Sequence, residues 1–253
     1  MSLKALIFDV DGTLADTELN GHRVAYNRAF EQLGIDWHWT ETTYGELLTV
    51  SGGKERMKYF VDNYQPDIPS GAVLEELINR IYTTKTKIFK EMLLTGLIPL
   101  RSGVERLFKE ARQAGIRLAI ATTTAPSNVQ YILSSNLGEE SLDWFDIIAA
   151  GDIVPNKKPS AEIYQLVLDE MGWQADECVA FEDSENGCLS ARGASLPTII
   201  TVTAYTRDEP FIGADLVLDQ FGDENDAASV IDDPAGSFNG QMLTIEYLIN
   251  KYR

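Results

Sequence analysis

The sequence predicts an α/β fold in which a doubly wound parallel sheet carries an inserted all-helical domain. Short, almost fully apolar segments recur along the chain, as expected of strands that are buried on both faces. From about residue 97 to 220 these segments alternate with segments of helical periodicity, which is typical of βαβ units. Between residues 16 and 94 there is no convincing strand, and three apolar stripes have helical spacing.

The first predicted strand ends at Phe8 and runs directly into two acidic residues and a glycine. Its residues are continuously apolar rather than alternating, so we expect a central strand with a loop at its carboxyl end. Similar short apolar runs predict the other strands, at residues 117–121, 147–150, 178–181, 198–202 and 216–218.

Helical stripes separate the strands and also fill the insertion. In the core they lie near residues 104–111, 129–133 and 163–171, and in the insertion near 22–33, 57–61 and 74–81. A last helix is expected near residues 242–249, after a surface loop at 219–237. We therefore assign residues 1–15 and 95–253 to the α/β core and residues 16–94 to a helical cap domain, a type of insertion that commonly acts as a lid.

The bulk properties restrict the class of partner. The chain has 253 residues, and its formal net charge of −18 disfavours nucleic acids and anionic membranes because the long-range field repels polyanions. A small phosphorylated substrate is compatible with this charge if its site has local basic residues. Cys178 and Cys188 have neither metal-type nor disulfide-type spacing, so we expect two buried thiols.

No signal peptide and no membrane-spanning run are recognised in the sequence. We expect a cytoplasmic monomer, with the plastid stroma as the alternative if a transit peptide has been removed.

The first chemical motif is Asp9-Val10-Asp11-Gly12-Thr13-Leu14, which directly follows the first strand. Ligands of open α/β sheets bind at the carboxyl ends of the strands, so two carboxylates here are candidates for chemistry. Such close carboxylates repel each other unless a cation lies between them or one is protonated. The alternative is an acidic turn that simply ends a strand.

Three further signals follow in the chain. Thr122 and Thr123 end the next core strand, Lys158 precedes Pro159 at an expected helix start, and Glu182-Asp183 end a later strand. Taken alone, each has an ordinary explanation: a β-branched strand end, a solvated lysine, and a helix N-cap at Asp183 or Ser184. Their order along the chain is more informative than any one of them.

Together these motifs resemble those of the haloacid dehalogenase superfamily, and the resemblance covers nearly the whole chain. It implies a Rossmann-like core and a phosphatase that forms an aspartyl-phosphate. Asp9 would be the nucleophile and Asp11 the general acid and base, while Thr122, Thr123 and Lys158 would hold the phosphoryl oxygens. The implied cofactor is Mg²⁺, with Asp9, Asp11, Glu182 and Asp183 around it; Asp11 would contribute its backbone carbonyl.

The cap resembles that of the β-phosphoglucomutase-like branch, and within it most closely the CbbY-like sugar-bisphosphate phosphatases. Gly52 and Gly53 at a helix start, with neighbouring basic residues, also suit an anion on physical grounds. Ser102 and Ser195 depart from this pattern, at positions where Pro and Gly are usual. The expected substrate-binding residues of this branch are Glu18, His22, Gly53, Lys54, Arg56, Lys85 and Arg101. A packed histidine at position 22 and ordinary surface lysines and arginines remain alternatives.

The function expected from this resemblance is hydrolysis of a phosphorylated sugar, with a ketose bisphosphate such as xylulose-1,5-bisphosphate favoured. A sugar phosphomutase, a phosphoglycolate-type phosphatase and a non-catalytic phosphate-binding module are the alternatives.

Overall fold

The computed structural model describes residues 3–50, 52–69 and 72–253. The chain divides into two compact units. One unit consists of residues 1–16 and 99–253, and the other is the continuous segment 17–98.

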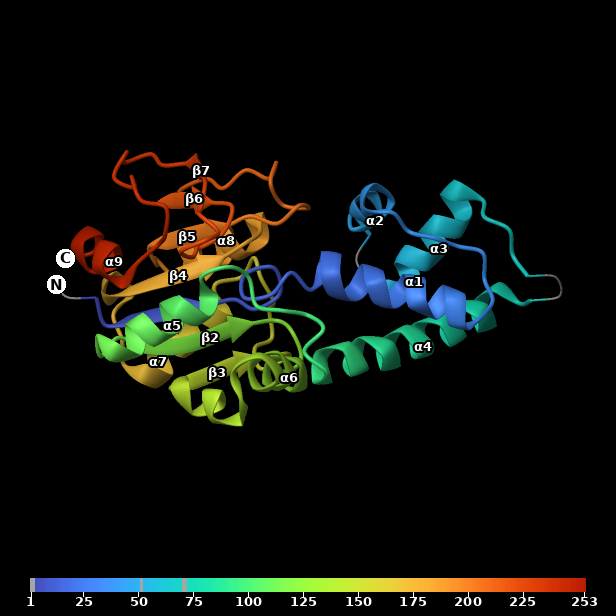
Figure 1. Cartoon of the computed structure of the whole chain (residues 1–253), viewed down its shortest axis with the longest axis horizontal. Coiled ribbons are helices and arrows are strands. Elements are labelled where there is room, and N and C mark those ends of the chain that lie inside the picture. The colour runs from blue at the N-terminus through green and yellow to red at the C-terminus, as the bar shows by residue number, and fades with distance from the viewer. Residues whose placement is uncertain (1–2, 51, 70–71) are drawn as a thin grey trace. The chain divides into compact units, whose positions relative to one another are not determined.

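The larger unit is built on one seven-stranded sheet, with strand order β3-β2-β1-β4-β5-β6-β7 (Figure 1). All neighbouring pairs are parallel except β6–β7. The strands are β1 Ala5–Phe8, β2 Arg117–Thr122, β3 Ile147–Ala150, β4 Cys178–Glu182, β5 Thr198–Thr201, β6 Leu216–Leu218 and β7 Val230–Asp232. Because β1 lies between β2 and β4, it occupies the topological switch point at which ligands of such sheets bind.

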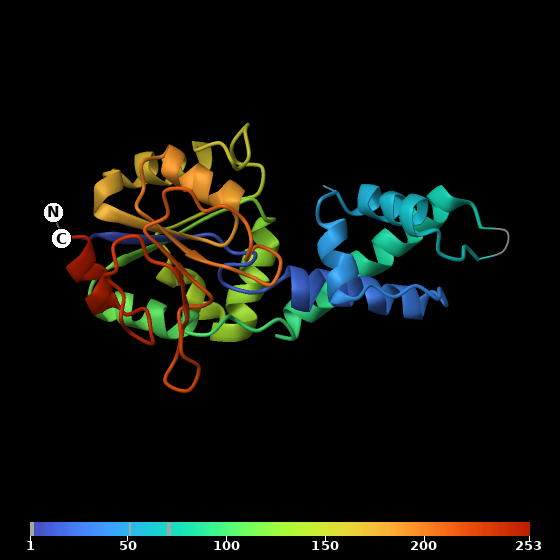
Figure 2. The same ribbon diagram turned by 90° about the horizontal axis from the view of Figure 1, so that it is seen from above.

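Helices cover both faces of this sheet, with α5 and α9 on one side and α7 and α8 on the other (Figures 1 and 2). The helical elements are α5 Val104–Gln113, α6 Pro126–Leu137, α7 Glu162–Met171, α8 Glu185–Gly193 and α9 Ile245–Lys251, with short 3₁₀ turns η2 Glu139–Trp144 and η3 Ala175–Glu177. Phe8 packs in the core under the switch point, stacked on Phe181 at 4.5 Å between ring centroids and edge-on to Phe108 at 5.0 Å. The predicted doubly wound α/β class is confirmed.

Two local predictions in this unit are wrong. The segment 219–237 was expected to be a loop, but it contains β7, a three-residue antiparallel edge strand. Its exposed and half-buried residues give no apolar run to detect. Pro159 does not begin a helix: it follows a cis peptide bond in a turn, and α7 begins at Glu162.

The smaller unit is entirely helical in its described part. It begins with the π-helical turn η1 and continues with four α-helices: η1 Glu18–His22, α1 Arg23–Gln32, α2 Glu41–Leu47, α3 Gly53–Tyr64 and α4 Leu74–Leu94. Its core is an aromatic cluster in which Trp39 contacts the rings of Tyr26, Phe30 and Tyr44. Helix α2 was not predicted, because its seven residues bury only Tyr44 and Leu47.

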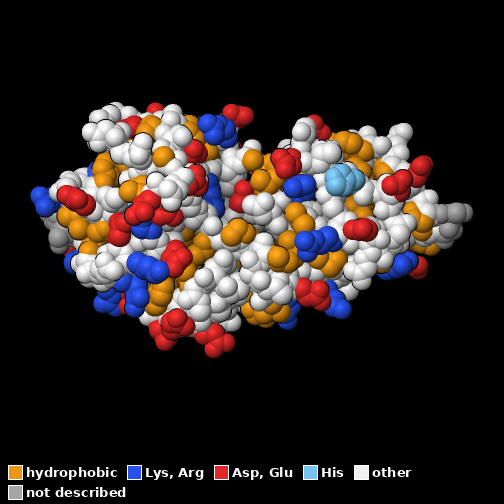
Figure 3. All heavy atoms as spheres, in the orientation of Figure 1, with side chains coloured by type: hydrophobic (Ala, Val, Ile, Leu, Met, Phe, Trp, Pro, Cys, Tyr) orange, Lys and Arg blue, Asp and Glu red, His pale blue; other side chains and the backbone are white. Residues whose placement is uncertain are grey.

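Acidic side chains occur in several separate places on the face shown in Figure 3, interspersed with basic and hydrophobic ones. Both cysteines are buried free thiols, as expected. Among the described residues, no helix is both long enough and apolar enough to span a bilayer.

Candidate active site

The parallel register brings the predicted catalytic segments to one edge of the sheet. Phe8 pairs with Ile120 of β2 and with Phe181 of β4. The residues that follow these positions, Asp9, Thr122 and the pair Glu182-Asp183, therefore lie at the carboxyl ends of adjacent strands. The Asp9 amide continues the ladder by donating to the Phe181 carbonyl at 2.9 Å, which fixes the backbone of this aspartate.

Lys158 joins two of the carboxylates. Its Nζ lies 2.6 Å from Asp9 Oδ1 and 2.6 Å from Glu182 Oε1, and it donates to the Ala121 carbonyl at 2.9 Å. All three charged side chains are nearly inaccessible to solvent. The alternative of a solvated lysine is therefore wrong.

The buried charges shift one another's protonation equilibria. Burial lowers the pKa of Lys158, but the Asp9 and Glu182 carboxylates outweigh this effect and raise it above its usual value, so the ammonium is retained. Burial raises the pKa of Glu182 to about 7, opposed by Lys158 and reinforced by Asp9. The hydroxyl of Tyr164 also donates to Glu182 Oε1, at 2.5 Å.

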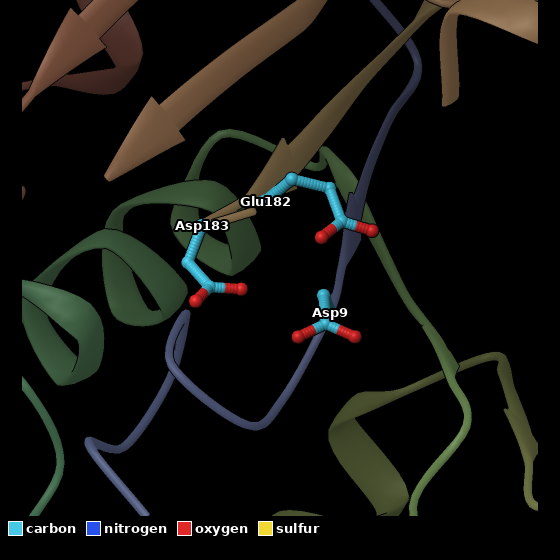
Figure 4. Close-up of side chains that lie close together, drawn as sticks. All are labelled: Asp9, Glu182 and Asp183. Carbon is cyan, nitrogen blue, oxygen red and sulfur yellow. The ribbon is translucent and has the colours of Figure 1, made fainter. Parts of the chain in front are cut away.

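A third carboxylate completes the group. Figure 4 shows the side chains of Asp9, Glu182 and Asp183 close together. Each offers an oxygen, and these atoms lie within 4.8 Å of one another. Burial, followed by the Asp9 and Glu182 charges, raises the pKa of Asp183 well above its usual value. Three buried carboxylates beside the Lys158 ammonium form a donor set that suits a divalent cation with oxygen ligands.

Helix capping does not explain Asp183. Ser184 is the N-cap of α8, and its hydroxyl accepts from the Gly187 amide at 3.2 Å. The Asp183 carboxylate approaches Gly12 instead: a Cβ built on Gly12 would lie 2.1 Å from Asp183 Oδ2. Gly12 has φ of +92°, so both its conformation and its lack of a side chain let the loop after β1 pass close to this carboxylate.

The three carboxylates and Lys158 line a pocket of about 250 Å³. Its lining contains all the predicted catalytic and metal-binding residues but not Arg101, together with four residues that were not predicted: Lys157, Ser184, Asn186 and Gly187. Tyr164 was also missed, because it follows Ile163 in an apolar helical stripe and looks like a core residue in the sequence. Thr122 is buried and Thr123 half-buried, both on the pocket wall.

Arg101 does not fit its predicted role as a phosphate ligand. Its guanidinium is largely buried and donates to the backbone carbonyls of Gly12, Thr201, Val202 and Asp219. Burial lowers its pKa, although Asp183 and other nearby carboxylates oppose this effect. The geometry directs the side chain to the backbone of the α/β unit.

Within the helical unit, two predicted residues, Glu18 and Arg56, are joined by hydrogen bonds through Tyr44, which was not predicted. Tyr44 donates to Glu18 Oε2 at 2.6 Å and accepts from Arg56 Nη1 at 2.8 Å. Burial and the Glu18 charge raise the pKa of Tyr44, so the phenol keeps its proton. Arg56 Nε is buried and has no hydrogen-bond partner among the described residues.

His22 and Lys85 form the neighbouring part of this unit. Lys85 Nζ lies 2.9 Å from His22 Nδ1, and Lys85 is itself buried. Burial, then the charges of Lys85 and Arg56, lower the pKa of His22 well below its usual value, so the imidazole is neutral. Because an ammonium has no acceptor, Nδ1 accepts this hydrogen bond. The His22 ring also packs on Phe89 at 3.9 Å between centroids, so packing and a polar contact coexist.

Gly53 is the first residue of α3, and its carbonyl accepts from Tyr26 Oη at 3.2 Å. Lys54 is exposed on the same turn, with Nζ 5.4 Å from the centroid of Tyr82. Lys54 and Arg56 thus lie in the first turn of α3, where the helix N-terminus favours an anion, and the acidic Glu55 lies in the same turn.

Known proteins are similar to this chain in sequence and in fold. Residues 3–195 match the family model of the haloacid dehalogenase-like hydrolases. Protein CbbY (plasmid) of Cupriavidus necator is 43% identical over 221 residues, 87% of each chain. A phosphorylated carbohydrates phosphatase of Thermotoga maritima is 31% identical, over 81% of this chain and 88% of that protein.

Solved structures give the same assignment. CbbY from Rhodobacter sphaeroides, in complex with phosphate and, as a mutant, with xylulose-(1,5)bisphosphate, has a TM-score of 0.70 and 45% identity. The match covers 87% of this chain and 96% of that one. The chain therefore belongs to the haloacid dehalogenase-like hydrolase family.

Proposed function

We propose that this chain is a Mg²⁺-dependent phosphatase that hydrolyses a phosphorylated sugar through an aspartyl-phosphate on Asp9. The observation that carries the proposal is the Asp9 carboxylate, held by the buried Lys158 ammonium in a pocket that Asp11, Glu182 and Asp183 also line. Family membership supports the hydrolase class. The substrate we favour is a ketose bisphosphate such as xylulose-1,5-bisphosphate, because a relative with 45% identity is solved with that compound.

The donor set fits Mg²⁺, whose preferred ligands are oxygens. The Asp9 and Asp183 carboxylates and the Asp11 backbone carbonyl would hold the ion, with Glu182 close by. Glu182 already accepts from Lys158 and Tyr164 through one oxygen, so we assign it chiefly to holding the lysine in place. When bound, Mg²⁺ supplies positive charge that offsets the phosphate and the transition state.

In the first half-reaction an Asp9 carboxylate oxygen attacks phosphorus, and the bond from phosphorus to the sugar oxygen breaks. The Asp11 carboxyl group gives its proton to the departing sugar oxygen. Lys158 and the hydroxyls of Thr122 and Thr123 hold the phosphoryl oxygens and stabilise their charge.

In the second half-reaction the Asp11 carboxylate takes a proton from a water molecule that attacks the phosphorus of the aspartyl-phosphate. The bond between phosphorus and the Asp9 oxygen breaks and inorganic phosphate is released. Asp9 is again a carboxylate and Asp11 is again protonated, so the cycle is closed.

Substrate choice is assigned to the helical unit. Arg56 is hydrogen-bonded to Tyr44 and Lys85 to His22. Lys54 adds a positive charge at the start of α3. In a chain with a net charge of −18, such local cations suit a second anionic group of the substrate. Glu18 and the neutral His22 are assigned to sugar hydroxyls, because each offers a hydrogen-bonding atom without adding positive charge.

The primary test is Asp9→Asn, which keeps the shape of the side chain and removes the nucleophile. We expect loss of Mg²⁺-dependent phosphate release from xylulose-1,5-bisphosphate with an unchanged circular dichroism spectrum. Asp62→Asn, at an exposed position on α3, is the matched control and should retain full activity. Activity retained by the Asp9 variant would refute the nucleophile, and accumulation of an isomeric sugar phosphate in place of inorganic phosphate would refute hydrolysis.

A further inference from the structure

The guanidinium of Arg101 connects three segments at the carboxyl edge of the sheet. Nη1 donates to the carbonyls of Gly12 and Thr201, the latter at 2.8 Å, and Nη2 donates to those of Val202, at 2.6 Å, and Asp219. Gly12 lies in the loop after β1, Thr201 ends β5, and Asp219 follows β6. The backbone of Arg101 also binds this loop, since its amide donates to the Leu14 carbonyl at 2.8 Å.

This attachment matters because the two catalytic aspartates are held in different ways. Asp9 is fixed by its ladder bond to Phe181 and by Lys158. Asp11 lies two residues further on, beyond the end of the ladder, and the next peptide carbonyl along the chain is the one that Arg101 holds. The loop is also closed on itself, because the Gly12 amide donates to the Ala15 carbonyl at 2.8 Å.

Arginine is the residue type that this arrangement requires. In the described part of the chain, the side chain of Arg101 donates hydrogen bonds to backbone carbonyls and, at 3.4 Å, to the Thr201 hydroxyl. A planar fork with fixed donor directions can hold carbonyls from separate segments in one geometry, whereas a lysine offers a single compact donor centre. Burial of a cation is costly, and here the backbone carbonyls that accept its hydrogen bonds offset part of this cost.

We propose that Arg101 is a positioning residue for Asp11: by holding the Gly12 carbonyl against β5 and β6, it keeps the Asp11 carboxyl group where it can protonate the leaving oxygen. The inference rests on the proposed function, in which Asp11 is the general acid. It assigns Arg101 a role in the protonation of the leaving group, not in substrate binding.

A comparison of two leaving groups tests this role. Sugar phosphates release an alkoxide that needs a proton, whereas p-nitrophenyl phosphate releases a stable phenolate that does not. Arg101→Lys keeps the charge and should lower kcat/KM about 10-fold or more for xylulose-1,5-bisphosphate, but less than about 3-fold for p-nitrophenyl phosphate. The ratio of the two values does not depend on the fraction of folded enzyme, so a structural role alone would leave it unchanged.

Arg106→Lys is the matched control. Arg106 also donates to backbone carbonyls, those of Gly222 at 2.7 Å and Leu243 at 3.0 Å, but among the described residues none of its hydrogen bonds reaches the loop after β1. Its replacement should lower the melting temperature and leave the ratio unaltered. In an Asp11→Asn background, Arg101→Lys should change the ratio no further, since both substitutions act on the same step.

Equal losses on both substrates in Arg101→Lys, or an altered ratio in Arg106→Lys, would overturn the positioning role while leaving the phosphatase intact. A different result bears on the proposed function. If Asp11→Asn affected both substrates alike, Asp11 would not be the general acid, and the inference would fall with that assignment.

Discussion

The close approach of Gly12 to Asp183 makes Gly12→Ala a sharp perturbation of the site. An ideal Cβ at this position lies 2.1 Å from Asp183 Oδ2 and 2.4 Å from its Cγ. Ordinary carbon–oxygen contacts are more than 3 Å long, so the carboxylate or the loop has to move by about 1 Å. The alanine also has to accept the φ of +92° that glycine tolerates.

Two effects of different size follow. Backbone strain at a positive φ costs about 1–2 kcal/mol, which corresponds to a fall in Tm of about 2–4 °C per kcal/mol for a domain of this size. Displacement of a catalytic group by about 1 Å lowers the rate about 10²-fold. We therefore expect a folded, slightly less stable enzyme with about one per cent of the activity and a weaker response to Mg²⁺.

Gly115→Ala separates the two effects. Gly115 has φ of +73°, but a Cβ there meets no atom within 4 Å, so it has the strain without the collision. The assay is kcat/KM at several Mg²⁺ concentrations, together with thermal unfolding of both variants. The reasoning is refuted if Gly12→Ala keeps its activity within about 3-fold, or if Gly115→Ala loses as much activity as Gly12→Ala.

Three further predictions concern the charged groups. Lys158→Met leaves Asp9 and Glu182 buried without their cation, so unfolding in urea should show a loss of about 3–5 kcal/mol together with loss of activity; an unchanged midpoint would contradict the ion-pair geometry. The pKa of Glu182 is raised to about 7 from its usual value of 4.5, so between these pH values the folded state binds more protons than the unfolded state. In EDTA, Tm should therefore fall as the pH rises from about 4.5 to 7. Saturating Mg²⁺ should make Tm depend less on pH. Lys54→Ala should raise KM for sugar bisphosphates more than for monophosphates, whereas Lys58→Ala, at another exposed position on the same helix, should change neither KM. Equal effects of Lys54→Ala on both substrate classes would refute the distal-anion role.

The strands could be predicted because burial on both faces of the sheet requires short runs of consecutive apolar residues. The predicted strands from β1 to β6 agree with the structure to within a residue or so at each end, and each is a short apolar run. Strand β7 and helix α2 left no such signature, since one is mostly exposed and the other buries only two side chains. Elements that lack a continuous buried face are therefore the ones that sequence reasoning misses.

The site residues also differ in whether a sequence motif predicts them. Asp9, Lys158 and Asp183 were predicted from motifs and their order along the chain, although Lys158 lies in a turn and not at the predicted helix start. The contacts of Arg101 and Tyr164 were not predicted, because the sequence reveals neither the carbonyls that surround a guanidinium nor the carboxylate that faces a buried phenol.

The fold class, and the sheet edge at which we place the chemistry, could be predicted from the amino-acid sequence, because they depend on local periodicity and on the order of motifs along the chain. The hydrogen bonds and ion pairs between the side chains at that edge became visible in the three-dimensional structure alone. Glu182 accepts hydrogen bonds from Lys158 and Tyr164. The Asp183 carboxylate lies close to Gly12, and Arg101 donates to backbone carbonyls. These contacts join residues that are far apart in the sequence, such as Lys158 and Asp9, which are 149 positions apart, and no local pattern encodes such pairings.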